Sequence, residues 1–351
     1  MAHPGQHPDA FYRGLRLLAI DGSQFSLTNT PQILSRYRKT VARRSRAAWA
    51  KLTAVVLLEV GLHNPLAVAV GQQGESEYIL TQRLWDKLPR KSLVLADRLC
   101  GCQAMIASFW DACRARDIHC LFRVRSNMQA AVLKRLPDGS AIVSIAVRDP
   151  KKSRRILRWL TVREIWVRAK RPGARTQLIR FWTTLLDWRQ APALELVSLY
   201  TRRWQHELYW RQMKLELRKT EVLQSHTPET AAQEIAALVL ATALLAQERS
   251  RAAAHQVPVL DISFLKCLEL IRPLWQFCAL AADLLTSTLL NQITRRFYQH
   301  IRFCLKPKPR ARSCARAVRQ PVTGWPRLLK PNYTHGPWSY TINKPGITER
   351  H

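Results

Sequence analysis

Three carboxylates stand where residue type and spacing favour metal chemistry. Asp21 and Asp97 each follow a short apolar run, which predicts an acidic side chain at the end of two strands. Glu207 lies in a stretch that is otherwise aromatic and basic. Carboxylates that converge repel one another unless they hold cations, and hard ions such as Mg²⁺ take oxygen ligands. Two such ions, roughly 3.5–4 Å apart, support phosphoryl transfer by activating a nucleophile and stabilising a leaving oxygen.

The stretch around Glu207, residues 199–219, is predicted to form a helix. Five side chains separated by steps of 3, 4, 3 and 4 fall on one face of that helix: Tyr200, Arg203, Glu207, Trp210 and Lys214. The alternative is a solvated face with intrahelical pairs such as Arg203–Glu207, each worth about 0.2–0.5 kcal/mol. A face that carries rings, cations and one acid favours a functional surface.

The charge of the chain points to a polyanionic partner. Its 351 residues include 56 Lys and Arg against 24 Asp and Glu, a net charge of +32. Nucleic acid is the natural partner for such a protein, and an anionic membrane surface is the rival. The start, MAHPGQHPDA, lacks the apolar segment of a signal peptide. The longest apolar run, residues 235–246, is too short to span a bilayer, which predicts a soluble, cytoplasmic protein.

Four of the eight cysteines lie close together in the sequence, so a zinc site has to be weighed. They are Cys100, Cys102, Cys113 and Cys120. Structural zinc sites usually pair two C-x2-4-C knuckles, and this spacing matches that pattern poorly. Reduced thiols packed as small hydrophobic side chains are the better interpretation.

The pattern of apolar runs predicts an α/β fold. The expected order is strand, strand, strand, helix, strand, helix, strand, at residues 15–20, 53–60, 66–70, 75–85, 93–96, 102–116 and 121–124. A turn is expected at Asp21-Gly22, and GLHNP supplies a hairpin connection between the second and third strands. Hairpins followed by helical crossovers indicate a mixed sheet with helices on its faces.

The rest of the chain changes character several times. Residues 126–190 are rich in Arg, Val, Ile and Trp and predict a β-rich insertion. Helices are expected at 193–219, from the N-cap Thr227 onward, and at 264–303. No acid occurs between Asp283 and Glu349, which predicts a basic, poorly ordered tail. The predicted regions are a core (1–125), the insertion (126–190), the second part of the core (191–250), a C-terminal helical region (251–305) and a basic, proline-containing tail (306–351).

These residues resemble a known family. Tyr200-x2-Arg203-x3-Glu207-x6-Lys214 matches the YREK signature of bacterial DDE-type insertion-sequence transposases. LYTRRWQHELYWRQMK is similar to the family's LYRxRWxIExxFxxxK, LRLLAIDGSQFSL resembles the region of its first catalytic aspartate, and LVLADRLCG resembles that of its second. The resemblance covers about residues 15–245. It implies a ribonuclease H-like mixed sheet flanked by helices and interrupted by a β-rich insertion.

The resemblance also implies a role for each matching residue. Asp21, Asp97 and Glu207 would be the catalytic triad that holds two Mg²⁺ or Mn²⁺ ions, whereas Tyr200, Arg203 and Lys214 would contact transposon-end DNA. Members of the family stack a flipped base on an aromatic residue of the insertion. The expected residue here is Trp182, with Trp159, Trp166 and Trp188 as alternatives and core packing as the competing interpretation for each.

The function implied is a DNA transposase that cleaves and transfers strands at insertion-sequence ends. Its partners would be double-stranded DNA, at transposon ends and target, and a second copy in a homodimeric synaptic complex, with no membrane. Only 20 residues precede Asp21, where the family carries a helical DNA-binding region. The first alternative is therefore an N-terminally truncated derivative that binds DNA without turnover. The second alternative is a nuclease with the same core and no strand transfer.

Overall fold

The computed structural model describes residues 1–42, 45–72, 74–149, 152, 155–170, 176–307 and 337–343. The chain divides into two compact units, and each is described by itself. Unit 1 comprises residues 1–100, 104–120 and 201–306. Unit 2 comprises residues 101–103, 121–200 and 307–351. Both units contain α-helix and β-strand, so the α/β class predicted from the sequence is confirmed.

Unit 1 is built on a mixed sheet whose central strand is β2 (Leu15–Leu27). On one side β2 pairs antiparallel with the long strand β4 (Ser45–Glu59). On the other side it pairs in parallel with β6 (Ser92–Ala96). The remaining strands are β1 (Phe11–Tyr12) beside β2, β3 (Lys39–Ala42) and β5 (Asn64–Val70) beside β4, and the start of β7 (Ile118–Arg123) beside β6. The predicted hairpin between β4 and β5 is confirmed.

The prediction that the first strand ends in a turn at Asp21-Gly22 is wrong. Strand β2 continues through Asp21 and stays paired with β4 as far as Leu27. The apolar run ends at Ile20 because β6 pairs no further than the position opposite Ile20. Beyond that point residues 21–24 are partly or fully exposed, and Phe25 and Leu27 are buried. The end of continuous burial marks the loss of one neighbouring strand, not the end of β2.

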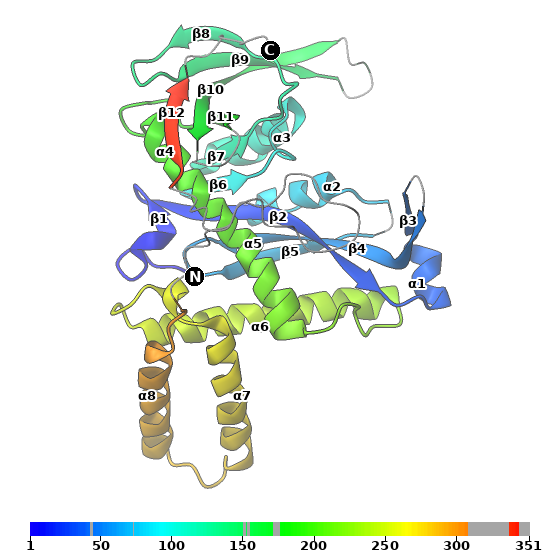
Figure 1. Ribbon diagram of the computed structural model, residues 1–351, viewed down its shortest axis with the longest axis vertical. Coiled ribbons are helices and arrows are strands. Elements are labelled where there is room, and N and C mark those ends of the chain that lie inside the picture. Colours follow the sequence, from blue (N-terminus) through cyan, green and yellow to red (C-terminus); the bar gives the residue numbers. More distant parts are fainter. Residues whose placement is uncertain are drawn as a thin grey trace, which may run out of the picture. The chain divides into compact units, whose positions relative to one another are not determined.

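Several helices of unit 1 pack on this sheet, and the last two extend away from it (Figure 1). The α-helices are α1 (Pro31–Arg36), α2 (Glu77–Gln82), α3 (Gln103–Cys113), α5 (Trp204–Arg211), α6 (Pro228–Ala253), α7 (Phe264–Leu280) and α8 (Ser287–Phe303). Short 3-10 turns occur at Pro8–Ala10, Trp85–Lys87, Arg114–Arg116, Thr201–Arg203 and Val259–Asp261. The region expected to be helical at 264–303 consists of two helices, α7 and α8, which lie side by side (Figure 1).

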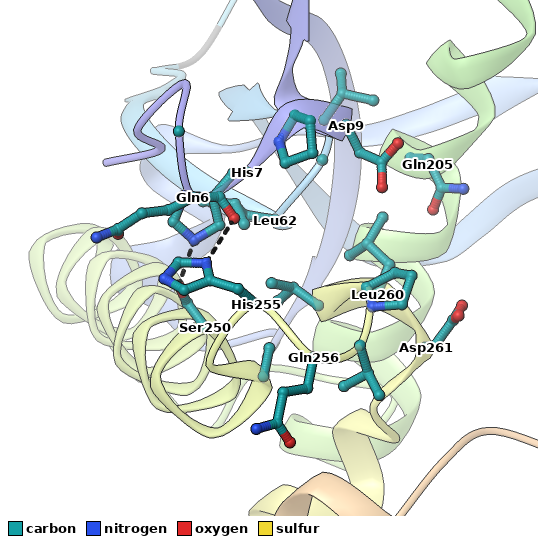
Figure 2. Close-up of a pocket in the computed structure, with 18 of the residues that line it drawn as sticks. Gln6, His7, Asp9, Leu62, Gln205, Ser250, His255, Gln256, Leu260 and Asp261 are labelled. Atoms are coloured by element: carbon teal, nitrogen blue, oxygen red, sulfur yellow. Dashed lines mark hydrogen bonds between the residues drawn. The ribbon is translucent and has the colours of Figure 1, made fainter.

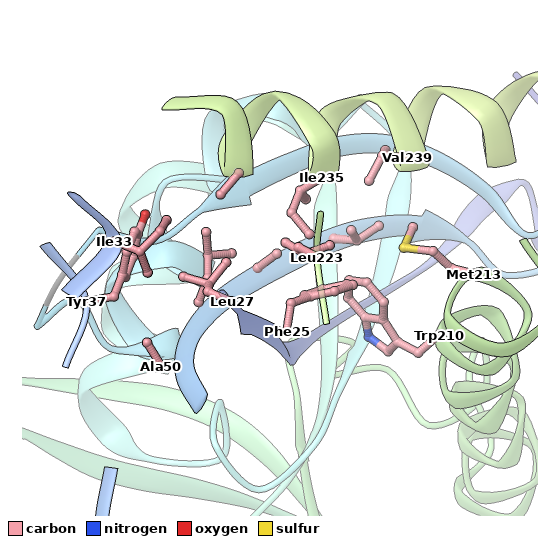
Figure 3. Packing of buried hydrophobic residues seen from close by; sticks show 14 of the residues in the cluster. Phe25, Leu27, Ile33, Tyr37, Ala50, Trp210, Met213, Leu223, Ile235 and Val239 are labelled. Atoms are coloured by element: carbon pink, nitrogen blue, oxygen red, sulfur yellow. The ribbon is translucent and has the colours of Figure 1, made fainter. Parts of the chain in front are cut away.

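Helix α6 begins where the sequence predicts. Thr227 is its N-cap and Pro228 its first residue, and Thr227 and Thr230 form a reciprocal capping box. Figure 3 shows Ile235 and Val239 of α6 facing Phe25 and Leu27 of β2 across a core of buried residues. Its length and composition would allow α6 to cross a membrane, but core helices of soluble proteins meet the same criteria. Its buried face packs into this core.

The helix predicted over residues 199–219 is not one regular helix. Helix α4 (Ala193–Tyr200) ends in a 3-10 turn, α5 follows, and Gln212–Arg218 forms a π-helix. The steps of 3 and 4 therefore do not describe a single stripe along one α-helix. Trp210, expected on the functional face, is buried and packs edge-on against Phe25 in the core of unit 1. π-helical segments are rare and often occur at functional sites.

Unit 2 is rich in β-strand over the region where the sequence predicts a β-rich insertion. Its strands are the end of β7, β8 (Ala131–Arg135), β9 (Ala141–Arg148), β10 (Ile156–Lys170) and β11 (Gln177–Thr183), in the sheet order β7-β11-β10-β9-β8. Strand β12 (Ser339–Asn343) pairs antiparallel with β10. The expectation of a poorly ordered tail is therefore wrong for these five residues, because the insertion offers β12 a strand to pair with. Most of the rest of the predicted tail lies outside the described residues.

Candidate active site

Strand register places two of the predicted acids side by side. Ile20 of β2 and Ala96 of β6 are Cα partners in the parallel pair. Asp21 and Asp97 are the residues that directly follow Ile20 and Ala96. Both therefore lie one residue beyond the last paired position of two neighbouring strands. The sequence-based expectation that these aspartates occupy neighbouring positions agrees with this register. Parallel pairing is what aligns them, because both strands run in the same direction from the paired residues Ile20 and Ala96.

The third acid is connected to the first by an arginine. Arg203 Nη2 lies 2.5 Å from Glu207 Oε1, and Arg203 Nη1 lies 3.6 Å from Asp21 Oδ2. The Arg203 side chain is 16% exposed, and those of Asp21 and Glu207 are 18% and 37% exposed. A guanidinium thus lies between two of the three carboxylates and balances part of their charge.

Burial and the neighbouring charges shift the pKa of Asp21. Its pKa is raised from 3.8 to about 7, chiefly because burial penalises the charged form. The charges of Asp97 and Glu77 raise the pKa of Asp21 further, whereas Arg203 lowers it. Glu77, at the start of α2, also has a raised pKa, because of its own burial and then because of Asp97. Four carboxylates of unit 1 therefore belong to this region, and the sequence pattern indicated only three.

Helix α5 is fixed to the sheet beside Asp21. His206, immediately before Glu207, is fully buried and its Nε2 lies 2.9 Å from the Val56 carbonyl oxygen. Val56 of β4 is the Cα partner of Asp21. This hydrogen bond ties the turn of helix that carries Glu207 to the strand position opposite Asp21. The sequence gives no pattern that would single out His206, because the bond joins residues 150 positions apart.

Lys214, a predicted DNA contact, is anchored within unit 1. Its Nζ donates hydrogen bonds to Ser23 Oγ and to the Gln24 carbonyl, both at 2.7 Å, and lies 4.6 Å from the centre of the Phe25 ring. Burial lowers the Lys214 pKa from 10.5 to about 8, and the charges of Arg218 and Lys51 lower it further. The side chain thus holds the π-helix against the segment of β2 that follows Asp21.

The two predicted DNA contacts of unit 2 have different environments. Tyr200 is partly buried and its ring lies 4.6 Å from that of Phe181. Trp182 is fully buried, and its indole N–H donates to Glu164 Oε1 at 2.9 Å. A base has no free face of Trp182 to stack on in this conformation, so its DNA-binding role stays a prediction. Among the alternatives, Trp159 is 58% exposed and lines a hollow of about 560 Å³ with Arg148 and Asn127.

The donor set suits a hard divalent cation. Asp21, Asp97, Glu77 and Glu207 supply only carboxylate oxygens, which are the ligands that Mg²⁺ and Mn²⁺ prefer. In the part of the chain that the structure describes, no three His, Cys, Asp or Glu side chains are already grouped tightly enough to hold a metal ion. Arg203 instead provides the positive charge between Asp21 and Glu207. The carboxylate oxygens are suitable ligands for a divalent cation. In this structure Arg203 contacts two of these acids, Asp21 and Glu207.

A separate cavity of about 620 Å³ lies elsewhere in unit 1 (Figure 2). Its wall includes His7 and His255, whose rings lie 6.4 Å apart, and Ser250, whose hydroxyl lies 2.7 Å from His7 Nε2. Arg202 and Gln205 also line it, but none of the four carboxylates does. This cavity is thus distinct from the acidic region.

The three predicted acids lie within a region that matches a known family. Residues 12–244, which include Asp21, Asp97 and Glu207, match the family model of the transposase DDE domain. The chain is 24% identical over 250 residues to transposase InsG for insertion sequence element IS4 of Escherichia coli (strain K12), across 71% of this chain and 55% of that protein. The chain thus spans about half the length of this curated relative.

A likeness also exists to a solved structure, a piggyBac transposase synaptic complex with hairpin DNA studied by cryo-electron microscopy. The TM-score is 0.42 and the identity 8%, over 84% of this chain and 58% of that one. The family model alone covers residues 12–244, well over half of the 351 residues. The chain belongs to the transposase DDE domain family.

Proposed function

We propose that this protein is a DNA transposase that carries out metal-dependent strand cleavage and strand transfer at insertion-sequence ends. One observation carries the proposal: the register of β2 and β6 aligns Asp21 with Asp97, and Arg203 connects Asp21 to Glu207. Membership of the transposase DDE domain family supports it. The mixed sheet, with its antiparallel β2, β4 and β5 and its parallel β6, supports a ribonuclease H-like core.

In this proposal Asp21, Asp97 and Glu207 hold two Mg²⁺ or Mn²⁺ ions. Bound there, the ions would supply charge stabilisation for the attacking and leaving oxygens of a phosphodiester. The chain's own contribution is to place the acids: β2 and β6 set the aspartates, and the His206 hydrogen bond sets the helix of Glu207. Arg203, which contacts Asp21 and Glu207 here, carries the charge and the donors that suit a phosphate contact.

The remaining parts of the proposal concern partners. Tyr200, Arg203 and Lys214 complete the YREK signature and are proposed contacts to transposon-end DNA, and an aromatic residue of the insertion, Trp182 or the exposed Trp159, would stack on a flipped base. The net charge of +32 supports duplex DNA as the substrate and predicts binding that weakens steeply with salt. We further propose a homodimer in the synaptic complex and a cytoplasmic location.

The test compares wild type with Glu207→Gln on a labelled element end, with Mn²⁺ present and absent. The amide keeps the size of the side chain but loses the charge that holds a divalent cation, so cleavage should fall by orders of magnitude while DNA binding persists. Glu269→Gln is the matched control, because Glu269 pairs with Lys266 at an exposed position on α7. Cleavage by Glu207→Gln near the wild-type rate would falsify this role.

Two further outcomes separate the alternatives. Cleavage without joining to target DNA would favour a nuclease with the same core. DNA binding without cleavage, by wild type and variant alike, would favour a derivative that binds DNA without turnover.

A further inference from the structure

Glu77 lies beside Asp21 without belonging to the transposase signature. It is the first residue of α2, whose N-cap Ser76 accepts a hydrogen bond from the Ile79 N–H. Helix α2 packs on β2 and β4 (Figure 1). The Glu77 side chain is partly buried, and its Oε1 lies 3.1 Å from the backbone nitrogen of Gly22. Glu77 therefore contacts the backbone immediately after the first predicted catalytic aspartate.

The Gly22 N–H needs this partner because β6 does not supply one. The β2–β6 pairing ends at Ile20 and Ala96, so Gly22 lies beyond the last β6 residue that pairs with β2. The Gly22 N–H is shared by two acceptors: Asp21 Oδ1 at 3.0 Å and Glu77 Oε1 at 3.1 Å. If Glu77 were absent, Asp21 Oδ1 would be the only one of these two acceptors left for the Gly22 N–H.

The absence of a side chain at position 22 makes the contact feasible. A Cβ at Gly22 would lie 2.5 Å from Glu77 Cδ and 2.7 Å from Glu77 Oε1, which is closer than real Cβ contacts. Any larger residue at position 22 would push the carboxylate of Glu77 away. Gly22 and Glu77 thus fit each other as a pair, one residue beyond Asp21.

We propose that Glu77 is a positioning residue that accepts the Gly22 N–H and so leaves the Asp21 carboxylate free to bind a divalent cation. This inference rests on the proposed function, because it concerns the same cation site. Both oxygens accept the Gly22 N–H here, and the oxygen of Glu77 would still satisfy this donor when Asp21 Oδ1 binds a cation. The Glu77 carboxylate acts through Asp21 and need not touch the cation.

A hydrogen-bonding role can be separated from a purely electrostatic one. Glu77→Gln keeps an oxygen that can accept the Gly22 N–H but removes the negative charge. Glu77→Ala removes both. The positioning role predicts that Glu77→Gln resembles wild type and that Glu77→Ala does not. A role through charge alone predicts that both variants lose the same property.

The first experiment needs no metal. Protein labelled with ¹⁵N-glycine gives amide signals for its 12 glycines, and Gly22→Ala identifies the signal of Gly22. In metal-free protein, Glu77→Ala should shift the Gly22 signal and speed its hydrogen exchange, while Glu77→Gln should leave it near the wild-type position. An unchanged Gly22 signal in Glu77→Ala would overturn the proposal, and so would equal changes in Glu77→Ala and Glu77→Gln.

The second experiment measures Mn²⁺ binding to the DNA-free protein by calorimetry. Glu77→Ala should bind Mn²⁺ several-fold more weakly than wild type, Glu77→Gln should stay close to wild type, and Gly22→Ala should resemble Glu77→Ala. The double variant Gly22→Ala/Glu77→Ala should bind Mn²⁺ about as weakly as either single variant, because both substitutions remove the same contact between Gly22 and Glu77. Wild-type affinity in Glu77→Ala would overturn the inference.

The same titrations separate this inference from the proposed function. Asp21→Asn should lose Mn²⁺ binding that wild type shows. Failure of wild type to bind Mn²⁺ would overturn the proposed cation site, and with it the role of Glu77 toward a cation. Binding that depends on Asp21 but not on Glu77 would overturn only the positioning role.

Discussion

Lys214 is hydrogen-bonded to Ser23, two residues beyond Asp21, with 2.7 Å between Nζ and Oγ. The same ammonium donates to the Gln24 carbonyl at 2.7 Å. These bonds join the π-helix that follows Glu207 to the half of β2 that has lost its β6 neighbour. The family resemblance implies that Lys214 contacts DNA, and its hydrogen bonds here give it a structural role as well.

We therefore expect Lys214→Ala to lower the free energy of unfolding. The substitution removes hydrogen bonds to the Gln24 carbonyl and the Ser23 hydroxyl, and because water can reach both acceptors the loss is about 1 kcal/mol. Urea titrations of wild type and variant would measure the difference. Lys87→Ala is the control, because Lys87 is 60% exposed and pairs only at the surface with Asp86. Equal stability of Lys214→Ala and wild type would mean that these bonds contribute nothing to folding.

Arg203 competes with a cation for the carboxylates it bridges. Replacing it with Gln removes a positive charge between Asp21 and Glu207. At pH 9, where Asp21 is ionised, we expect Arg203→Gln to bind Mn²⁺ several-fold more tightly than wild type. Unit charges about 4 Å apart interact by on the order of 1 kcal/mol even in water.

Arg202→Gln is the matched control for this prediction. Arg202 is the preceding residue and has the same charge, but its guanidinium contacts Asp9 instead. Calorimetric titration with Mn²⁺ should leave Arg202→Gln at the wild-type affinity. Weaker binding by Arg203→Gln at pH 9 would show that the arginine organises the acids for the cation instead of competing with it.

Much of unit 1 is predictable because its signals are local. The apolar run before Asp97 and the capping residues Thr227 and Pro228 each mark an element boundary by themselves. The true length of β2 is not predictable in this way. Its polar second half, from Asp21 to Leu27, is a strand only because β4 pairs with it, and that pairing is non-local.

The same distinction between local signals and non-local contacts applies to the residues of the candidate site. Asp21 and Asp97 are predictable as candidates because each follows an apolar run, and Glu207 because of its spacing within the YREK pattern. Glu77 and His206 are not predictable in this way, because each contacts a distant strand, at Gly22 and Val56. The periodic stripe placed Trp210 with Glu207, but the break into α5 and a π-helix and the packing on Phe25 assign Trp210 to the core.

Binding of a divalent cation should depend on pH through Asp21. Its pKa is raised to about 7 by burial first and by Asp97 and Glu77 next. Below pH 7 a cation must displace a proton, so the apparent Mn²⁺ affinity should fall by up to about tenfold per pH unit. Above pH 8 it should level off. Calorimetry between pH 5.5 and 8.5 would measure this, and an affinity independent of pH across that range would contradict it.

The same shift has a consequence for stability in the absence of metal. An acid with a raised pKa binds its proton more tightly in the folded state, so stability contributed by protonated Asp21 is lost as pH rises through about 7. Asp21→Asn should therefore raise the melting temperature at pH 8 and have less effect at pH 5. Thermal unfolding at both pH values, in the presence of a chelator, would test this sign.

Two buried histidines should make the protein sensitive to acid. Burial lowers the pKa of His63 from 6.5 to about 3, although hydrogen bonds to Gln212 and Gln205 oppose the shift. Burial likewise lowers the pKa of His206 to about 4. The unfolded chain then binds more protons than the folded protein below about pH 6.5. Stability should fall as the pH drops toward 4, by up to about 1.4 kcal/mol per pH unit for each histidine.

His206→Gln isolates the contribution of one of these histidines. The glutamine amide can still donate to the Val56 carbonyl, but it cannot take up a proton. In urea titrations from pH 7 to pH 4, the variant should lose stability less steeply than wild type. The opposing contribution of Asp21 is present in both proteins and cancels in the comparison. Replacing the exposed His226 with Gln should leave the wild-type slope unchanged. Parallel slopes for wild type and His206→Gln would show that His206 is not the source of acid sensitivity.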